Sequence, residues 1–272
     1  MTIRIGEIDY ANCTPIFTML RQHFDCSGYR FVQGVPATLN GLLSRGEIDV
    51  CPSSSIEYGF SPDSYVLLPE LSISSVGTVK SVLLFSRVPI EELDRQTIGL
   101  TAESATSVNL LKIILARHYG FVNEFRRFTL PPDKALESFP AVLLIGDAAL
   151  RAKGVEQGHV YDLGELWYSF TGRPFVFALW LARRDVVESR HGELRILADA
   201  LVSAKQRAYD SYGEIAATSP SLAWMGNADL VDYWRTISYD LTPDHLEGVR
   251  TFYRYAAEMG ILAREPDIRL FA

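Results

Sequence analysis

Two strand–helix units, a strand-rich passage between them and one long apolar strand constrain what this chain of 272 residues can fold into. The first unit spans residues 3–51, where alternating apolar and polar positions predict a strand and a leucine stripe predicts a helix. The second unit begins near residue 91, after the strand-rich residues 65–85. Residues 175–181 are apolar throughout, as in a central strand buried on both faces. The alternation predicts an α/β fold.

The order of these segments favours a chain that leaves a first lobe, builds a second lobe and then returns. Two hinge-crossing strands would connect the lobes, as in the type II periplasmic-binding-protein-like fold, and a ligand would occupy the cleft between them. We expect residues 1–86 and 177–272 to form the first lobe and residues 87–176 to form the second. A single doubly wound sheet is the competing arrangement.

Charge and hydropathy narrow the class of partner. The formal net charge is -7, whereas proteins that bind a nucleic-acid backbone normally present a basic face. We therefore expect no nucleic-acid partner, and any anionic ligand must be held by local features. No apolar run approaches the ~20 residues that span a bilayer, and the N-terminus shows no export signal. These patterns indicate a cytoplasmic protein without a membrane partner.

Cysteines, histidines and glycines give no support for a metal or a cofactor. The three cysteines, Cys13, Cys26 and Cys51, match no metal-ligand spacing, and their odd number argues against a disulfide framework. The five histidines are scattered along the chain, and no glycine-rich phosphate loop is present. We expect neither a metal site nor a nucleotide or flavin cofactor.

Four polar clusters follow predicted strands, at the sheet edge where open α/β folds bind ligands. The clusters are Asn12, then Ser53, Ser54 and Ser55, then residues 104–107 at the start of a helix, with Thr106 and Ser107 as candidates, and finally Asp147. A helix N-terminus stabilises an anion by roughly 0.3–1 kcal/mol when exposed. Each cluster also has a purely structural interpretation, as a helix N-cap or as a turn. Their joint placement after strands that point to one cleft favours a shared ligand site.

At these clusters, long stretches of the sequence resemble the menaquinone-biosynthesis family of the futalosine route. The similar stretches are residues 5–15, 35–40, 46–50, 53–58, 72–82, 104–107 and 171–178. The resemblance spans nearly the whole chain, and it implies the same two-lobed fold.

The resemblance implies one of two cofactor-free activities. One is the dehydration of chorismate to 3-[(1-carboxyvinyl)oxy]benzoate, and the other is the cleavage of cyclic dehypoxanthinyl futalosine to 1,4-dihydroxy-6-naphthoate. The synthase branch of the family carries His-Glu after the strand that corresponds to residues 141–145, and its His is the base. Gly146 and Asp147 stand there in this chain, which favours the dehydratase, as does Asn12.

For a dehydratase, the resemblance and the polar clusters imply a set of site residues. Asn12 would orient the substrate's enolpyruvyl carboxylate, which itself takes the proton, and Asp147 is a second candidate for proton transfer. The residues expected to bind the substrate are Ser53, Ser54, Ser55, Ser75, Thr106, Ser107 and Thr171. A non-catalytic small-anion binding protein is the alternative from another class. A homodimer through the C-terminal helices is left open.

Overall fold

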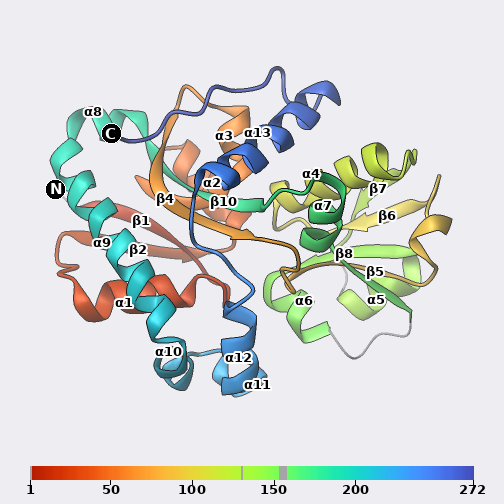
Figure 1. The fold of residues 1–272 in the computed structure, drawn as a ribbon, viewed down its shortest axis with the longest axis horizontal. Helices are drawn as coiled ribbons and strands as arrows, with labels where there is room; N and C mark the ends of the chain where they lie inside the picture. The colour runs from red at the N-terminus through yellow and green to blue at the C-terminus, as the bar shows by residue number, and fades with distance from the viewer. Residues whose placement is uncertain (1, 130, 153–157) are drawn as a thin grey trace.

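The strands form two sheets, and each sheet is the centre of one lobe in Figure 1. The computed structural model describes residues 2–129, 131–152 and 158–272. The lobe on the right of Figure 1 is drawn in yellow and green, whereas the lobe on the left combines red and orange segments with teal and blue ones. The first lobe therefore contains both the beginning and the end of the chain.

The first sheet has the strand order β2-β1-β3-β10-β4. β1 is parallel to β2 and β3, whereas β10 is antiparallel to β3 on one side and to β4 on the other. The strand that returns from the second lobe is therefore inserted beside the strand that leaves the first. Its strands are β1 (Ile3–Ile8), β2 (Tyr29–Gly34), β3 (Val50–Ser54), β4 (Tyr65–Ser75) and β10 (Phe175–Arg183).

The second sheet has the strand order β7-β6-β8-β5-β9. β6 is parallel to β7 and β8, and β5 is antiparallel to β8 and β9. Its strands are β5 (Val82–Ser86), β6 (Thr97–Leu100), β7 (Glu124–Arg127), β8 (Ala141–Ile145) and β9 (His159–Asp162).

Helices cover both sheets, and α9 lies along α1 on the first lobe. The helices that belong with the first sheet are α1 (Thr14–His23), α2 (Pro36–Ser44), α3 (Ser55–Phe60), α8 (Arg184–Ser189), α9 (His191–Asp210), α10 (Tyr212–Thr218), α11 (Leu222–Met225), α12 (Asn227–Trp234) and α13 (Pro243–Glu258). Those that belong with the second are α4 (Ala105–Ile113), α5 (Pro132–Ser138), α6 (Gly146–Ala152) and α7 (Leu163–Thr171), with a 3-10 turn at Ile90–Glu92 and a π-helical turn at Ile114–His118.

The predicted two-lobed α/β fold is confirmed, and a single doubly wound sheet is wrong. The apolar residues 175–181 lie inside β10, at an inner position of the first sheet. The lobe boundaries at residues 86 and 176 remain predictions, although β5 pairs in the second sheet and β10 pairs in the first along its whole length. Segments 76–81 and 172–174 connect the two sheets.

Local differences from the predicted elements concern the ends of strands. The strand expected over residues 48–51 is β3, which begins at Val50 and continues through Ser54. Gly6 explains the tight packing at this point, because a Cβ on Gly6 would lie 2.6 Å from Cys51 Sγ. β1 and the side chains of β3 can therefore approach only at a residue without a side chain.

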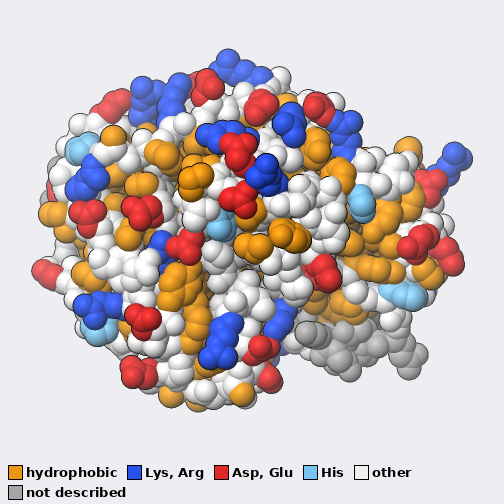
Figure 2. All heavy atoms as spheres, in the orientation of Figure 1, with side chains coloured by type: hydrophobic (Ala, Val, Ile, Leu, Met, Phe, Trp, Pro, Cys, Tyr) orange, Lys and Arg blue, Asp and Glu red, His pale blue; other side chains and the backbone are white. Residues whose placement is uncertain are grey.

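The surface shows no separation of charge on the face drawn in Figure 2, where Lys and Arg side chains alternate with Asp and Glu. Within the described ranges, no helix is long and apolar enough to cross a membrane.

Candidate active site between the lobes

A cavity of about 50 Å³ lies between the two lobes. Three of the polar clusters predicted from the sequence meet in its wall, through Asn12 and Ser54 from the first lobe and Ser107 from the second. Its lining consists of Ile8, Tyr10, Asn12, Pro36, Ser54, Ile73, Val79, Ser81, Val82, Ser104, Ser107, Ile145, Gly146, Phe177 and Ala178. The strand ends of both sheets therefore converge on one small, partly apolar space.

Asn12 lies in the turn between β1 and α1, and its backbone is held from the C-terminal part of the chain. The Asn12 carbonyl accepts a hydrogen bond from the Tyr239 hydroxyl at 2.7 Å. The neighbouring carbonyl of Ala11 accepts one from Trp234 Nε1, also at 2.7 Å. In contrast, the buried Oδ1 of the Asn12 side chain has no hydrogen-bond partner among the described residues. The turn is thus fixed while the side-chain oxygen remains available to a ligand.

Only one residue of the serine triplet lines the cavity. Ser54 ends β3 and contributes to the wall. Ser53 is fully buried outside the lining, and its Oγ finds no partner in the part of the chain that the structure describes. Ser55 begins α3, and its hydroxyl donates to the Val176 carbonyl at 2.7 Å. Successive strand residues point to opposite faces, which explains why Ser53 and Ser54 differ.

The start of α4 supplies the second lobe's polar wall. The N-cap is Ser104, whose Oγ accepts from the Ser107 backbone N at 3.3 Å, so the interpretation of Thr106 and Ser107 as caps is wrong. The Ser104 and Ser107 hydroxyls are 3.2 Å apart, and both residues line the cavity. Thr106 faces the other lobe, where its Oγ1 accepts from the Ile56 backbone N at 3.1 Å.

Asp147 bridges the lobes and is not part of the cavity wall. Its Oδ1 accepts from the backbone N of Ala11 at 3.1 Å, one residue before Asn12. Burial raises the pKa of the Asp147 carboxyl above its usual value; the bond from Ala11 and the charge of Arg151 oppose this rise, and the charges of Asp9 and Glu103 add to it. The carboxylate therefore holds the Asn12 turn from the second lobe.

Tyr10 makes a second bridge beside the cavity. Its hydroxyl donates to Glu103 Oε2 at 2.8 Å, and its ring lies against Gly146. Gly146 has a φ of 56°, and a Cβ there would lie 2.9 Å from the Tyr10 ring. The backbone conformation and the contact both require glycine at this position.

Ser75 and Thr171 lie outside the cavity lining. The Ser75 hydroxyl donates to the Gly77 carbonyl at 2.8 Å, within the segment that connects the sheets. Thr171 ends α7, and its hydroxyl donates to the Trp167 carbonyl at 2.8 Å. The Ser75 hydroxyl therefore stabilises a local turn, and the Thr171 hydroxyl bonds to the preceding turn of its own helix.

Sequence reasoning missed three polar or aromatic residues of the wall, namely Tyr10, Ser81 and Phe177. Ser104 belongs to the predicted cluster at the start of this helix, although only Thr106 and Ser107 of that cluster were expected to bind the substrate. Ser81 accepts a hydrogen bond from the Tyr233 hydroxyl at 2.9 Å, and only the folded chain brings these two residues together.

The cavity wall is polar without being charged. Its described lining contains no lysine, arginine, histidine, aspartate or glutamate. Hydroxyls, the Asn12 amide and the backbone amides at the start of α4 are therefore the groups that can bind an anion there. Across the described ranges, no group of three or more His, Cys, Asp or Glu is placed to hold a metal ion.

Two lobes of this topology around a central cavity define the periplasmic-binding-protein-like class of fold. The aliphatic sulphonate binding protein SsuA from Escherichia coli has a similar structure, with a TM-score of 0.69 and 15% identity over 100% of this chain and 92% of that one. Protein AF1704 from Archaeoglobus fulgidus has a TM-score of 0.76 and 18% identity, covering 96% and 98% of the two chains.

Within that class, this chain belongs to the menaquinone biosynthesis family, whose model matches residues 3–258. It is 34% identical to a chorismate dehydratase from Thermus thermophilus, over 91% of this chain and 93% of the relative. It is 26% identical to a 1,4-dihydroxy-6-naphtoate synthase from Streptomyces coelicolor, over 97% and 98% of the two chains.

Proposed function

We propose that this chain is a chorismate dehydratase, a hydro-lyase that converts chorismate to 3-[(1-carboxyvinyl)oxy]benzoate in the futalosine route to menaquinone. The observation that carries the proposal is one cavity between two lobes that joins Asn12, Ser54 and Ser107. The 34% identity to the T. thermophilus dehydratase supports the same activity. We place the reaction in the cytoplasm.

The reaction requires positioning rather than a redox partner. Chorismate is a small dianion that loses its ring hydroxyl and the proton on the carbon bearing the enolpyruvyl ether. The hydroxyl and the proton leave as water, and the ring becomes aromatic. The atoms therefore balance without an oxidant or a reductant, and aromatisation supplies the driving force.

Neutral donors in the wall suit a substrate whose own carboxylate takes the proton. A lysine or arginine beside that carboxylate would lower its pKa and weaken it as a base. Hydroxyls of Ser54 and Ser107 and the amides of α4 can bind carboxylates without a formal positive charge. We assign to Asn12 the orientation of the enolpyruvyl carboxylate toward the ring proton.

Closure of the lobes completes the site in this proposal. A cavity of about 50 Å³ holds only a few water molecules, since each needs roughly 10–15 Å³. Chorismate is larger than this space, so in this proposal it binds with the lobes further apart than they are here, and closure of the lobes onto it then excludes water. The hydrogen bonds of Thr106 and Asp147 across the interface hold the closed arrangement.

Incubation of the purified protein with chorismate, without added metal or cofactor, tests the proposal. We expect 3-[(1-carboxyvinyl)oxy]benzoate to accumulate in proportion to enzyme, as measured by liquid chromatography against a standard. A well-folded protein that binds chorismate without converting it would indicate a binding protein instead.

The similarity to the S. coelicolor synthase makes cyclic dehypoxanthinyl futalosine the second substrate to test. One position of the site disfavours this second activity. The synthase branch carries His where Gly146 stands, and a Cβ on Gly146 would already lie 2.9 Å from the Tyr10 ring. We expect no 1,4-dihydroxy-6-naphthoate from this substrate.

A further inference from the structure

The turn that carries Asn12 is held by residues from the opposite end of the chain. The Tyr239 hydroxyl donates to the Asn12 carbonyl across 227 positions of sequence, and Trp234 Nε1 donates to the Ala11 carbonyl across 223. Tyr239 and Trp234 are both fully buried. The buried Oδ1 of Asn12 has no hydrogen bond to a described residue, so the direction of this side chain depends strongly on the backbone of the turn.

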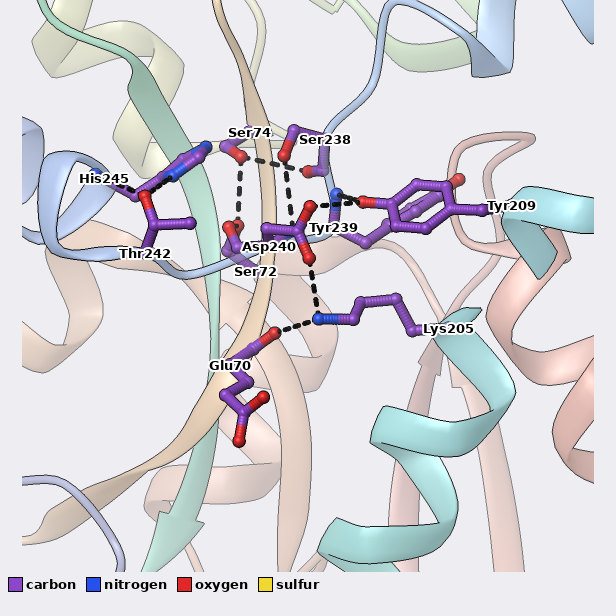
Figure 3. Close-up of polar contacts among 10 residues, drawn as sticks. All are labelled: Glu70, Ser72, Ser74, Lys205, Tyr209, Ser238, Tyr239, Asp240, Thr242 and His245. Carbon is purple, nitrogen blue, oxygen red and sulfur yellow. Dashed lines mark hydrogen bonds and ion pairs between the residues drawn. The ribbon is translucent and has the colours of Figure 1, made fainter. Parts of the chain in front are cut away.

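A partly buried polar network of Tyr209, Asp240 and Lys205 holds the backbone at Tyr239, as Figure 3 shows. The Tyr239 backbone N donates to the Tyr209 hydroxyl at 2.8 Å, and that hydroxyl donates to Asp240 Oδ2 at 3.0 Å. Lys205 Nζ donates to Asp240 Oδ1 and to the Glu70 carbonyl, each at 2.7 Å. Lys205 is only 2% exposed, so its charge depends on these two acceptors.

The backbone around Tyr239 is also attached to the edge of the first sheet. Ser238 N donates to the Ser74 carbonyl and Ser74 N donates to the Ser238 carbonyl, both at 2.8 Å. Ser72 N donates to the Tyr239 carbonyl at 2.9 Å, and the Ser72 hydroxyl donates to the Asp240 carbonyl at 2.5 Å. The segment thus runs along β4 like a short additional strand, which gives Tyr239 little freedom.

We propose that Tyr239 is a positioning residue for Asn12, and that the Lys205–Asp240–Tyr209 network keeps Tyr239 in place. The inference rests on the proposed function, because that function gives Asn12 its role. Loss of the Tyr239 hydroxyl leaves a buried carbonyl without its donor and releases one end of the turn. A reacting group displaced by about 1 Å can cost up to roughly 100-fold in rate.

Tyr239→Phe tests this role because it removes the hydroxyl and keeps the buried ring. Tyr58→Phe is the control, since Tyr58 is also fully buried and lies away from the cavity; its hydroxyl donates to the Asp267 carbonyl at 2.7 Å and accepts from Arg269 N at 2.9 Å. We expect kcat to fall about tenfold in Tyr239→Phe with KM changed less than about twofold. We expect near-normal kcat in Tyr58→Phe, although both variants lose some thermal stability.

Two further readouts separate positioning from a general loss of stability. Amide hydrogen exchange at residues 10–13 should accelerate in Tyr239→Phe and not in Tyr58→Phe. In an Asn12→Ala background, Tyr239→Phe should cause no additional loss of kcat, because the residue acts through Asn12. An additive loss, or unchanged exchange with unchanged kcat, would overturn the inference.

The exchange measurement also distinguishes this inference from the proposed function. If wild-type protein does not convert chorismate, the proposed function fails, yet faster exchange confined to residues 10–13 would still establish that Tyr239 holds the turn. If wild-type protein converts chorismate but Tyr239→Phe leaves the exchange at residues 10–13 unchanged, the positioning role fails and the proposed function stands.

Discussion

The two walls of the cavity are built in different ways. In the second lobe, Ser107 is positioned by its own helix, because the cap of α4 is Ser104, three residues earlier. In the first lobe, Asn12 is positioned by Tyr239 and Trp234, which follow it by more than 220 residues. One wall therefore depends on local sequence, whereas the other depends on the completed fold.

This difference decides how each wall should respond to substitution. A change in the local wall should affect one helix end and leave the rest of the molecule intact. A change in the long-range wall should either abolish the ligand contact itself or disturb several buried groups at once. Four predictions test this contrast, from the largest expected effect to the smallest.

Asn12→Ala should reduce kcat/KM by at least roughly 100-fold while the protein remains folded. The side-chain oxygen bonds to no described protein group, so its removal should not change the unfolding midpoint appreciably. Asn40→Ala is the matched control, since Asn40 Oδ1 is also buried without a partner among the described residues and lies outside the cavity wall. Steady-state kinetics and circular dichroism of both variants check this, and near-normal turnover in Asn12→Ala would remove that residue from the site.

Lys205→Met should lower the free energy of unfolding by about 2 kcal/mol, measured by urea denaturation. Breaking a buried ion pair costs roughly 3–5 kcal/mol, and the loss should be smaller here because the Asp240 side chain is 38% exposed. Arg250→Met is the control, because its pair with Glu247 is exposed on both sides and should contribute less than about 0.5 kcal/mol. Equal stability of the two variants would contradict the structural role of the Lys205 network.

Ser104→Ala should destabilise the protein by about 1 kcal/mol through loss of the α4 cap. Ser104→Thr should retain most of that stability, because threonine also caps helices. Thermal unfolding of the two variants measures the difference. If Ser104→Ala disturbed hydrogen exchange at residues 10–13 as strongly as at the start of α4, the two walls would not be independent.

Asp147→Asn should alter how the stability of the protein depends on pH. Its activity should stay within about threefold of wild type, because asparagine can still accept the bond from Ala11. Burial raises the pKa of the Asp147 carboxyl, so the folded protein favours its protonated form. Wild type should therefore lose stability relative to Asp147→Asn as pH rises through the raised pKa, and the two should match below about pH 4.

Melting temperatures of wild type and Asp147→Asn, measured from below about pH 4 to pH 7, test this difference in stability. Steady-state kinetics of both proteins at pH 7 test the effect on activity. A loss of roughly 100-fold or more in kcat for Asp147→Asn would instead identify Asp147 as a proton-transfer group.

The sequence predicts the fold class well because strand and helix periodicities are local and repeated. The apolar residues 175–181 and the alternation in residues 3–8 are examples, and both are strands in the structure. The lobe assignment of β5 was harder, since residues 82–86 read as a continuation of the strand-rich passage. Only pairing with β8 and β9 places them in the second sheet.

The structure brings three of the predicted clusters to one cavity, but it separates the individual hydroxyls within them. Ser53, Ser54 and Ser55 are equivalent in sequence, but strand alternation and the start of α3 direct only Ser54 to the cavity. The roles of Thr106 and Asp147 depend on groups in the opposite lobe, which no local pattern specifies. Sequence therefore locates the clusters, and tertiary contacts decide which atoms face the cavity.

The insertion of β10 between β3 and β4 has a consequence for synthesis on the ribosome. Residues 82–171 contain every strand of the second sheet, so that sheet can form while the chain is still growing. Until β10 is made, the edges of β3 and β4 that pair with it remain without a partner strand. Trp234 and Tyr239 emerge later still, so the Asn12 turn gains these two hydrogen bonds only after more than 220 further residues have been made.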